Sequence, residues 1–256
     1  MIHLLTREEF LERIRSDSEG FLESIRRFEG YVVKQFFPQE GILRFRRFLE
    51  SFSNRSAPSW HPCLDGCPDY HRIHDEYPQA YVKSKMHGYY FHRWNENRSV
   101  FDPFKEIFEI KNRLAGADKE AHYEAIPSQG VISRVVSHQY PRGGGYQAEH
   151  VDPASPFALI QTILQASRIG EDFRSGGLFF RRSKEEEPIW VDRHTQMGDL
   201  IVLSPDVQHG VAPIDSEENL DWSRTDGRWI ILPVIIRSDY AADPSLKPQQ
   251  VGRDAG

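Results

Sequence analysis

The second half of the chain is a succession of short β-forming runs, and this feature limits the possible folds more than any other. Eight runs combine β-branched, apolar and aromatic residues. They cover 131–140, 147–151, 157–166, 176–181, 189–194, 199–203, 208–214 and 228–237. The segments between them are turn-forming, and none reads as a crossover helix. Because parallel strands need such crossovers, the pattern predicts antiparallel strands in a sandwich or barrel.

The first half of the chain has the character of a helical layer. Thr6 is followed three residues later by Glu9, which is the pattern of a helix N-terminus, so we expect the chain to enter a helix from its first residues. The other elements expected here are helices at 21–28, 42–53 and 103–114 and a strand at 31–37. Segment 54–100 lacks sustained periodicity, which is typical of a lid or binding loop.

The length of 256 residues suits one domain with one large core. We expect a single domain over 1–256, mainly β with α. In it, 1–129 would form the helical and loop-rich part, 130–240 the β core and 241–256 a frayed tail.

The overall charge and the cysteine content limit the partners and the compartment. The net charge of -6 gives no uniformly basic surface, so we expect no nucleic-acid partner. No apolar run approaches the roughly 20 residues of a membrane span, and the first residues lack a signal peptide's basic and apolar regions. Two cysteines make no disulfide framework, which favours a cytoplasmic location. The oligomeric state is not predicted.

His150 and Asp152 form the strongest candidate for a metal site. On a strand, residues i and i+2 emerge on the same face, so both side chains can bind one ion. His209, at the start of a later predicted strand, is the candidate third ligand. Two imidazoles and one carboxylate on one octahedral face suit a non-haem Fe(II) oxygenase. A single histidine near a strand end is more often a surface or core residue, so the motif needs support from its surroundings.

Four linked motifs supply that support. They are the tyrosine and glycine loop with the first ligands at 140–152, Ser-Gly-Gly-Leu-Phe-Phe at 175–180, the segment 198–213 around His209, and Gly-Arg-Trp at 227–229. In this order they resemble the Fe(II)/2-oxoglutarate-dependent oxygenase superfamily, in particular its prolyl-hydroxylase-like branch. The resemblance covers about residues 130–237.

This resemblance implies a double-stranded β-helix, the jelly-roll or cupin-like core, behind an N-terminal helical layer. It implies Fe(II), 2-oxoglutarate as co-substrate and O2, with His150, Asp152 and His209 as the catalytic metal ligands. Arg228 stands where the family binds the far carboxylate of the co-substrate, because a guanidinium can hold a carboxylate bidentately. Arg237, near the other end of that strand, is the alternative.

Tyr140 and Arg134 are further candidates for hydrogen bonds to the co-substrate. Segment 215–226 is longer and more acidic than the family pattern, which leaves the register of the last strand open.

Two other features allow a second interpretation. Cys63, Cys67, His71 and His74 could complete a tetrahedral zinc set, although their close spacing favours an irregular loop over the active site. The run 89–94 is either a wall of the substrate pocket or an aromatic stripe buried under the barrel.

The expected function is a dioxygenase that hydroxylates a small metabolite, such as an amino acid or a natural-product intermediate. The alternatives are a protein or peptide hydroxylase of the prolyl type and a non-redox β-barrel metal-binding protein.

Overall fold

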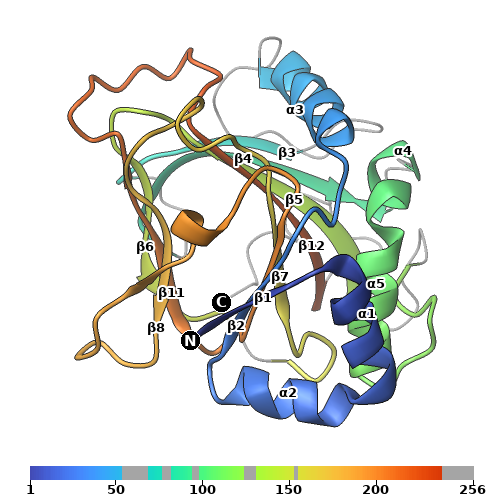
Figure 1. Ribbon diagram of the computed structural model, residues 1–256. Coiled ribbons are helices and arrows are strands. Elements are labelled where there is room, and N and C mark those ends of the chain that lie inside the picture. Colours follow the sequence, from blue (N-terminus) through green and yellow to red (C-terminus); the bar gives the residue numbers. More distant parts are fainter. Residues whose placement is uncertain (54–68, 77–81, 94–97, 124–130, 153–154, 238–256) are drawn as a thin grey trace.

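The computed structural model describes residues 1–53, 69–76, 82–93, 98–123, 131–152 and 155–237 (Figure 1). The helices are α1 (Arg7–Ser16), α2 (Ser18–Arg26), α3 (Gln39–Ser53), α4 (Arg98–Phe101) and α5 (Lys105–Leu114), with 3-10 turns η2 (Asp102–Phe104) and η3 (Asp192–His194). The strands are β1 (Ile2–Leu5), β2 (Gly30–Val33), β3 (Asp69–Ile73), β4 (Ser84–His92), β5 (Val131–Tyr140), β6 (Gly145–His150), β7 (Gln161–Gln165), β8 (Gly177–Arg181), β9 (Ile189–Trp190), β10 (Leu200–Leu203), β11 (Gln208–Ile214) and β12 (Arg228–Arg237).

Two antiparallel sheets make up the β core. The larger has the order β5-β12-β7-β10, and the smaller has the order β6-β11-β8-β9. The chain crosses to the other sheet at every step from β5 to β12 except between β8 and β9. This winding is the double-stranded β-helix, so the predicted fold class is confirmed.

The edges of the core are extended by strands from the first half of the chain. β4 pairs with β5 through its second half and with β6 through its start, so it continues from one sheet into the other. β3 adds to β4. At the opposite edge β2 pairs with β10, and β1 runs parallel to β2. Extra strands at both edges leave fewer backbone groups of the core unpaired.

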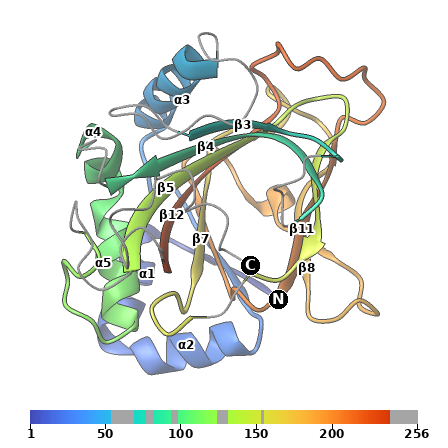
Figure 2. The same ribbon diagram turned by 180° about the vertical axis from the view of Figure 1, so that it is seen from behind.

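Helices cover the outer face of the larger sheet, as Figures 1 and 2 show. Phe21 of α2 and Phe108 of α5 share an apolar cluster with Trp229 and Ile231 of β12. The intervening Ile230 belongs to a second cluster, which lies between the two sheets. The period of two along the strand therefore separates the helical side from the interior of the barrel. No helix within the described ranges is long and apolar enough to span a bilayer.

The structure corrects the prediction that 54–100 is irregular. β3 and β4 both lie in this segment. β4 reads Ser-Lys-Met-His-Gly-Tyr-Tyr-Phe-His and is buried along most of its length. Helices cover one face of it and the barrel interior the other, so the polar and apolar residues do not alternate in the way that marks a half-exposed strand.

Three shorter predictions are also wrong in part. The chain begins with β1 instead of a helix, and Thr6 then caps α1 in a capping box with Glu9. The strand expected at 31–37 ends at Val33. The strand expected at 189–194 ends at Trp190, where the chain turns into η3. That turn places Asp192 inside the protein, where it is nearly fully buried.

The entry into β8 depends on a glycine beside Asp192. Gly177 has a φ of 110°, a conformation that L side chains rarely adopt. A Cβ atom at this position would lie 2.2 Å from the Oδ2 atom of Asp192. The same carboxylate accepts a hydrogen bond of 2.8 Å from the backbone N–H of Leu178. A side chain at position 177 would therefore push the start of β8 away from Asp192.

We predict that Gly177→Ala lowers the free energy of unfolding by about 3–5 kcal/mol, the sum of backbone strain and a steric clash. The matched control is Gly144→Ala, because Gly144 has a similar φ of 104° with nothing within 4 Å of its added Cβ. That change should cost about 1–3 kcal/mol, from strain alone. Urea unfolding measures both. Equal losses would show that Asp192 does not restrict position 177.

Candidate metal centre

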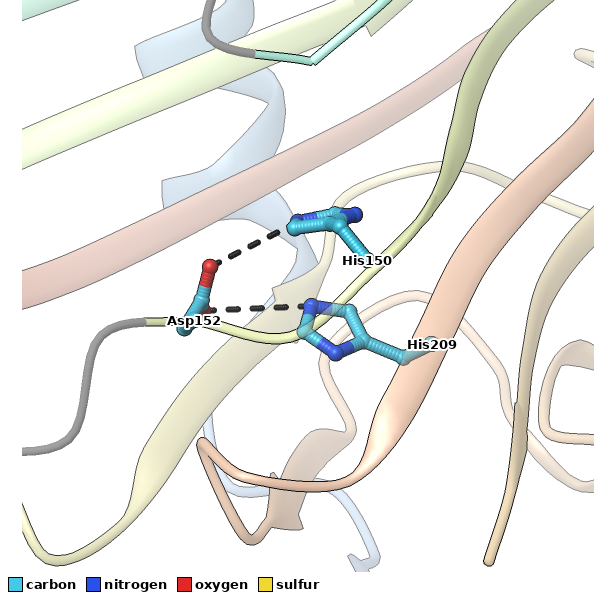
Figure 3. Close-up of side chains that lie close together, drawn as sticks. All are labelled: His150, Asp152 and His209. Carbon is cyan, nitrogen blue, oxygen red and sulfur yellow. Dashed lines mark ion pairs between the residues drawn. The ribbon is translucent and has the colours of Figure 1, made fainter. Parts of the chain in front are cut away.

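The structure brings the three predicted ligands to one place (Figure 3). His150 at the end of β6 is the cross-strand partner of His209 in β11, and their ring centroids lie 4.4 Å apart. Asp152 follows two residues after His150. Its carboxylate oxygens lie 3.5 Å from Nε2 of His150 and 3.8 Å from Nε2 of His209. All three ligand atoms lie within 4.8 Å of one another, which is close enough to bind a single ion.

The position of Asp152 is set by the backbone. Its N–H donates a hydrogen bond of 2.9 Å to the carbonyl oxygen of Pro205, in the turn that leads into β11. The strand pairing of His150 with His209 sets the two rings side by side. Asp152 lies beyond the end of β6, and the short extension after the strand turns back toward the strand that carries the third ligand.

Hydrogen bonds fix the tautomer of both histidines. Nδ1 of His150 donates to the carbonyl oxygen of Ala148 at 2.9 Å, and Nδ1 of His209 donates to that of Val207 at 2.8 Å. Because a carbonyl oxygen only accepts, the proton of each ring is on Nδ1, and Nε2 is the atom that each ring would offer to a metal. Burial also lowers the pKa of His209, which favours the neutral imidazole that binds metals.

Gln161 supports the centre from the opposite sheet, and no sequence motif marked it in advance. It is the first residue of β7, and its side-chain amide donates to Oδ2 of Asp152. The same nitrogen lies 3.5 Å from Nε2 of His209. A glutamine in this position orients the carboxylate without adding charge, which is how groups around a metal centre hold its ligands.

The three candidate ligands line a cavity of about 480 Å³ between the sheets. The inward-facing residues of β5 and β12 form much of its wall. They are Arg134, Val136, His138, Tyr140, Arg228, Ile230, Leu232 and Val234. The volume lies in the range that binds a small molecule. Arg228, Tyr140 and Arg134, which were predicted from the resemblance, are thus all brought to the same cavity as the candidate ligands.

Arg228 is fully buried and already bound to a carboxylate. Its Nε and Nη2 atoms donate to the two oxygens of Asp192 at 2.6 Å and 2.9 Å. Its Nη1 atom is buried and has no hydrogen-bond partner among the described residues. Buried polar atoms are almost always satisfied, so this orphan donor marks a place where a ligand oxygen would fit.

Tyr140 lies next to Arg228, as its cross-strand partner in β5. Its hydroxyl donates to the Gln147 side chain at 2.9 Å and lies 3.2 Å from Nδ1 of His138. Burial raises the pKa of Tyr140 and lowers that of His138 to about 3, so both groups are neutral near neutral pH. Nε2 of His138 is a second buried atom with no partner among the described residues.

Arg134 and Arg237 lie farther along the strands from Arg228. Arg134 has its guanidinium carbon 5.3 Å from the centre of the Tyr90 ring, and both residues line the cavity. Arg237, the proposed alternative to Arg228, lines the cavity at the far end of β12 and is exposed. Of the two candidates for binding the far carboxylate, Arg228 is therefore more buried than Arg237.

The aromatic run 89–94 was predicted to form either a wall of the substrate pocket or a buried stripe, and its residues do both. Tyr90 lines the cavity, whereas Tyr89 and Phe91 belong to the apolar cluster on the helical side of the sheet. Trp94 lies outside the described residues.

The possible zinc set stays a prediction, because half of it cannot be placed. Cys63 and Cys67 lie outside the described residues. His71 is buried on β3, and His74 follows the end of that strand.

Comparison with known proteins identifies the fold. No family model and no curated protein matches the chain. Three solved structures share the fold over most of the chain. A prolyl-4-hydroxylase from Pseudomonas putida is 10% identical with a TM-score of 0.51, and the match covers 86% of this chain and 98% of that one.

The other two structures match over more of this chain. A full-length protein of Neurospora crassa, solved in complex with alpha-KG, is 13% identical with a TM-score of 0.53, covering 92% of this chain and 84% of that one. JOX2, in complex with 2OG, Fe and JA, is 14% identical with a TM-score of 0.52, and the match covers 97% of this chain and 78% of that one. At these identities the likeness concerns the fold.

The pairing of Arg228 with Asp192 leads to a prediction for stability. Asp192→Asn should lower the free energy of unfolding by about 3–5 kcal/mol, because it leaves a buried guanidinium without its counter-charge. Arg228→Met combined with Asp192→Asn should restore most of that loss, since the double change removes both charges. Chemical denaturation of the three proteins measures the coupling. If the double variant is as unstable as Asp192→Asn alone, the charge of Arg228 is not the cause.

Proposed function

We propose that the chain is an Fe(II)- and 2-oxoglutarate-dependent dioxygenase. The observation that carries the proposal is a single cavity that holds two histidines and one aspartate at metal-binding distances and, in its wall, the buried Arg228 with an orphan N–H. Two of the structures with the same fold are complexes with 2OG and Fe or with alpha-KG, which supports this assignment.

The donor set fits Fe(II). His150, His209 and Asp152 offer two neutral nitrogens and one carboxylate, and three coordination positions of an octahedral ion would remain open. When bound, Fe(II) and 2-oxoglutarate would supply the oxidising chemistry, in which O2 converts the co-substrate to succinate and CO2 and oxidises a C–H bond of the primary substrate. Arg228 would hold the far carboxylate of the co-substrate.

The residues of the chain have positioning roles in this proposal. Asp192 holds the guanidinium of Arg228 from one side, so Nη1 is the atom left for a ligand. Gln161 holds the carboxylate of Asp152. The neutral Tyr140 and the apolar walls from Ile230 and Leu232 would exclude water from the site, which favours oxidation of the substrate over side reactions.

The cavity favours a small molecule as the primary substrate. Its volume of about 480 Å³ is within the range of small-molecule sites. A peptide hydroxylase of the prolyl type would need an extended groove beside the metal centre, and a metal-binding protein without redox activity would consume no co-substrate. Oxygen-dependent formation of succinate separates the enzyme from the latter.

The first test is metal binding. The purified protein should bind one Fe(II) per chain under anaerobic conditions, whereas His150→Ala and His209→Ala should each reduce the affinity by at least tenfold, because each removes one of three ligands. Titration calorimetry with Co(II) as an oxygen-stable substitute gives the stoichiometry. His194→Ala is the control, since His194 is exposed on η3 and does not line the cavity. Unchanged affinity in His209→Ala would remove that residue from the ligand set.

The second test concerns the co-substrate. Arg228→Met combined with Asp192→Asn should keep the fold and the metal, but raise the Kd for 2-oxoglutarate by at least tenfold, because a charged hydrogen bond to the carboxylate is lost. The measurement is calorimetric titration of 2-oxoglutarate into the Co(II)-loaded protein. Arg237→Met should bind 2-oxoglutarate as the wild type does. The reverse result would make Arg237 the co-substrate residue.

A further inference from the structure

The cavity contains a lysine that the proposed co-substrate site does not use. Lys111 lies on α5 and is only 3% exposed, yet it lines the cavity. Its ammonium donates one hydrogen bond, of 3.3 Å, to the carbonyl oxygen of Ile160. An ammonium group has three N–H donors, so a single long hydrogen bond leaves most of its capacity unused.

The position of Lys111 is unfavourable for folding. It lies on the buried face of α5, three residues after Phe108 and three before Leu114, which are both buried. Among the described residues, Lys111 forms no ion pair with a carboxylate, and burying a charge without a partner in contact is costly. Burial lowers the pKa of Lys111 to about 7, and the charge of Asp152 raises it by less. Groups in such an environment are enriched at functional sites.

The charges around the cavity are mainly positive. Its described lining includes four basic residues, Lys111, Arg134, Arg228 and Arg237, and a single acidic one, Asp152. Arg228 is compensated by Asp192, and Asp152 belongs to the metal centre. Apart from the ion pair of Arg228 with Asp192, the described lining thus has three basic residues and one acidic residue, although the whole chain has a net charge of -6.

Lys111 is linked to the metal centre by adjacent residues. The carbonyl that it binds belongs to Ile160, and the next residue, Gln161, holds the carboxylate of Asp152. The ammonium of Lys111 therefore contacts the residue next to Gln161, whose side chain holds the candidate ligand Asp152. Ile160, Phe157 and Ile235 line the cavity here and give it an apolar surface. An anion bound at Lys111 with an aliphatic body would lie beside the metal centre.

We propose that the primary substrate is an organic anion whose carboxylate or phosphate group pairs with Lys111 and whose aliphatic part lies against Ile160, Phe157 and Ile235. The oxidation of this substrate rests on the proposed function. The anion site does not, because its binding can be measured without turnover.

The experiment uses hexanoate as the probe, with hexyl phosphate and the neutral hexanamide as the other arms. Binding is measured by calorimetry on the full chain loaded with Co(II) and saturated with 2-oxoglutarate, which keeps the probe away from Arg228. Hexanoate or hexyl phosphate should bind the wild type at least tenfold more tightly than hexanamide does. Lys111→Met should lose this preference, since the change keeps the shape and removes the charge.

Lys105→Met is the matched control, because Lys105 lies on the same helix but is only partly buried and pairs with Glu120. It should bind hexanoate like the wild type. If hexanoate is preferred, the group recognised is a carboxylate, and if hexyl phosphate is preferred, it is a phosphate; both support the proposal. Failure of the wild type to bind either anion, or equal binding by Lys111→Met, overturns it.

Thermal stability gives a second, independent measurement. Removing a buried ammonium should raise the Tm of the ligand-free protein, so we expect Lys111→Met to melt several degrees higher than the wild type. A lysine kept only for its hydrogen bond to Ile160 would give a lower Tm on removal. A lower Tm together with unchanged anion binding would therefore identify Lys111 as a structural residue. If the wild-type protein binds no metal, the proposed function is contradicted instead. The anion preference can then still be measured in the metal-free protein.

Discussion

The buried ion pair of Asp192 and Arg228 is the interaction on which the rest of the barrel depends. The carboxylate of Asp192 accepts hydrogen bonds from Arg228 in β12, from the backbone of Leu178 in β8 and from the side chain of Gln165 in β7. β8 belongs to the smaller sheet, whereas β7 and β12 belong to the larger. One carboxylate thus joins the two sheets, and it also positions the guanidinium that faces the cavity. An ion pair this deep is retained only when most of its hydrogen-bonding groups are paired, and Nη1 of Arg228, which has no partner among the described residues, is the exception.

A second polar connection between the sheets lies at the candidate metal centre. Gln161 of the larger sheet binds Asp152, which adjoins His150 and His209 of the smaller sheet. Two nitrogen lone pairs and a carboxylate converge there, and all of them are electron-rich. Such groups repel one another, and in the proposed function a metal ion would lie between them. The cavity therefore lies between the ion pair of Asp192 with Arg228 and the candidate metal centre.

Features whose signal lies in neighbouring residues were predicted from the sequence, whereas features that depend on distant partners were not. β5, β11 and β12 have the predicted bounds, and the structure brings together His150, Asp152 and His209, which strand periodicity and the motifs around them predicted as ligands. β4 was missed because both of its faces are buried. The sequence predicts a strand at Asp192, because the partner that holds it in a turn, Arg228, is 36 residues away. Lys111 was missed because a single lysine on an otherwise apolar helical face does not by itself indicate a functional site. Each of these depends on a partner that is distant in the sequence.

The acidic insertion before β12 shows how a long connection can leave the register of a strand unchanged. Segment 215–226 carries Asp215, Glu218 and Asp226, and all three form ion pairs with the single guanidinium of Arg142. Arg142 lies two residues after the end of β5, so these carboxylates hold the insertion against the strand that pairs with β12. The hydrogen bond from Gly227 to the carbonyl of Asp172 then fixes the last residue before that strand. Arg228 consequently pairs with Tyr140, which places its guanidinium within reach of Asp192. The carboxylates of the insertion thus pair with Arg142, whereas the described lining of the cavity contains more basic than acidic residues. A chain with an overall negative charge can in this way line a cavity mainly with basic residues.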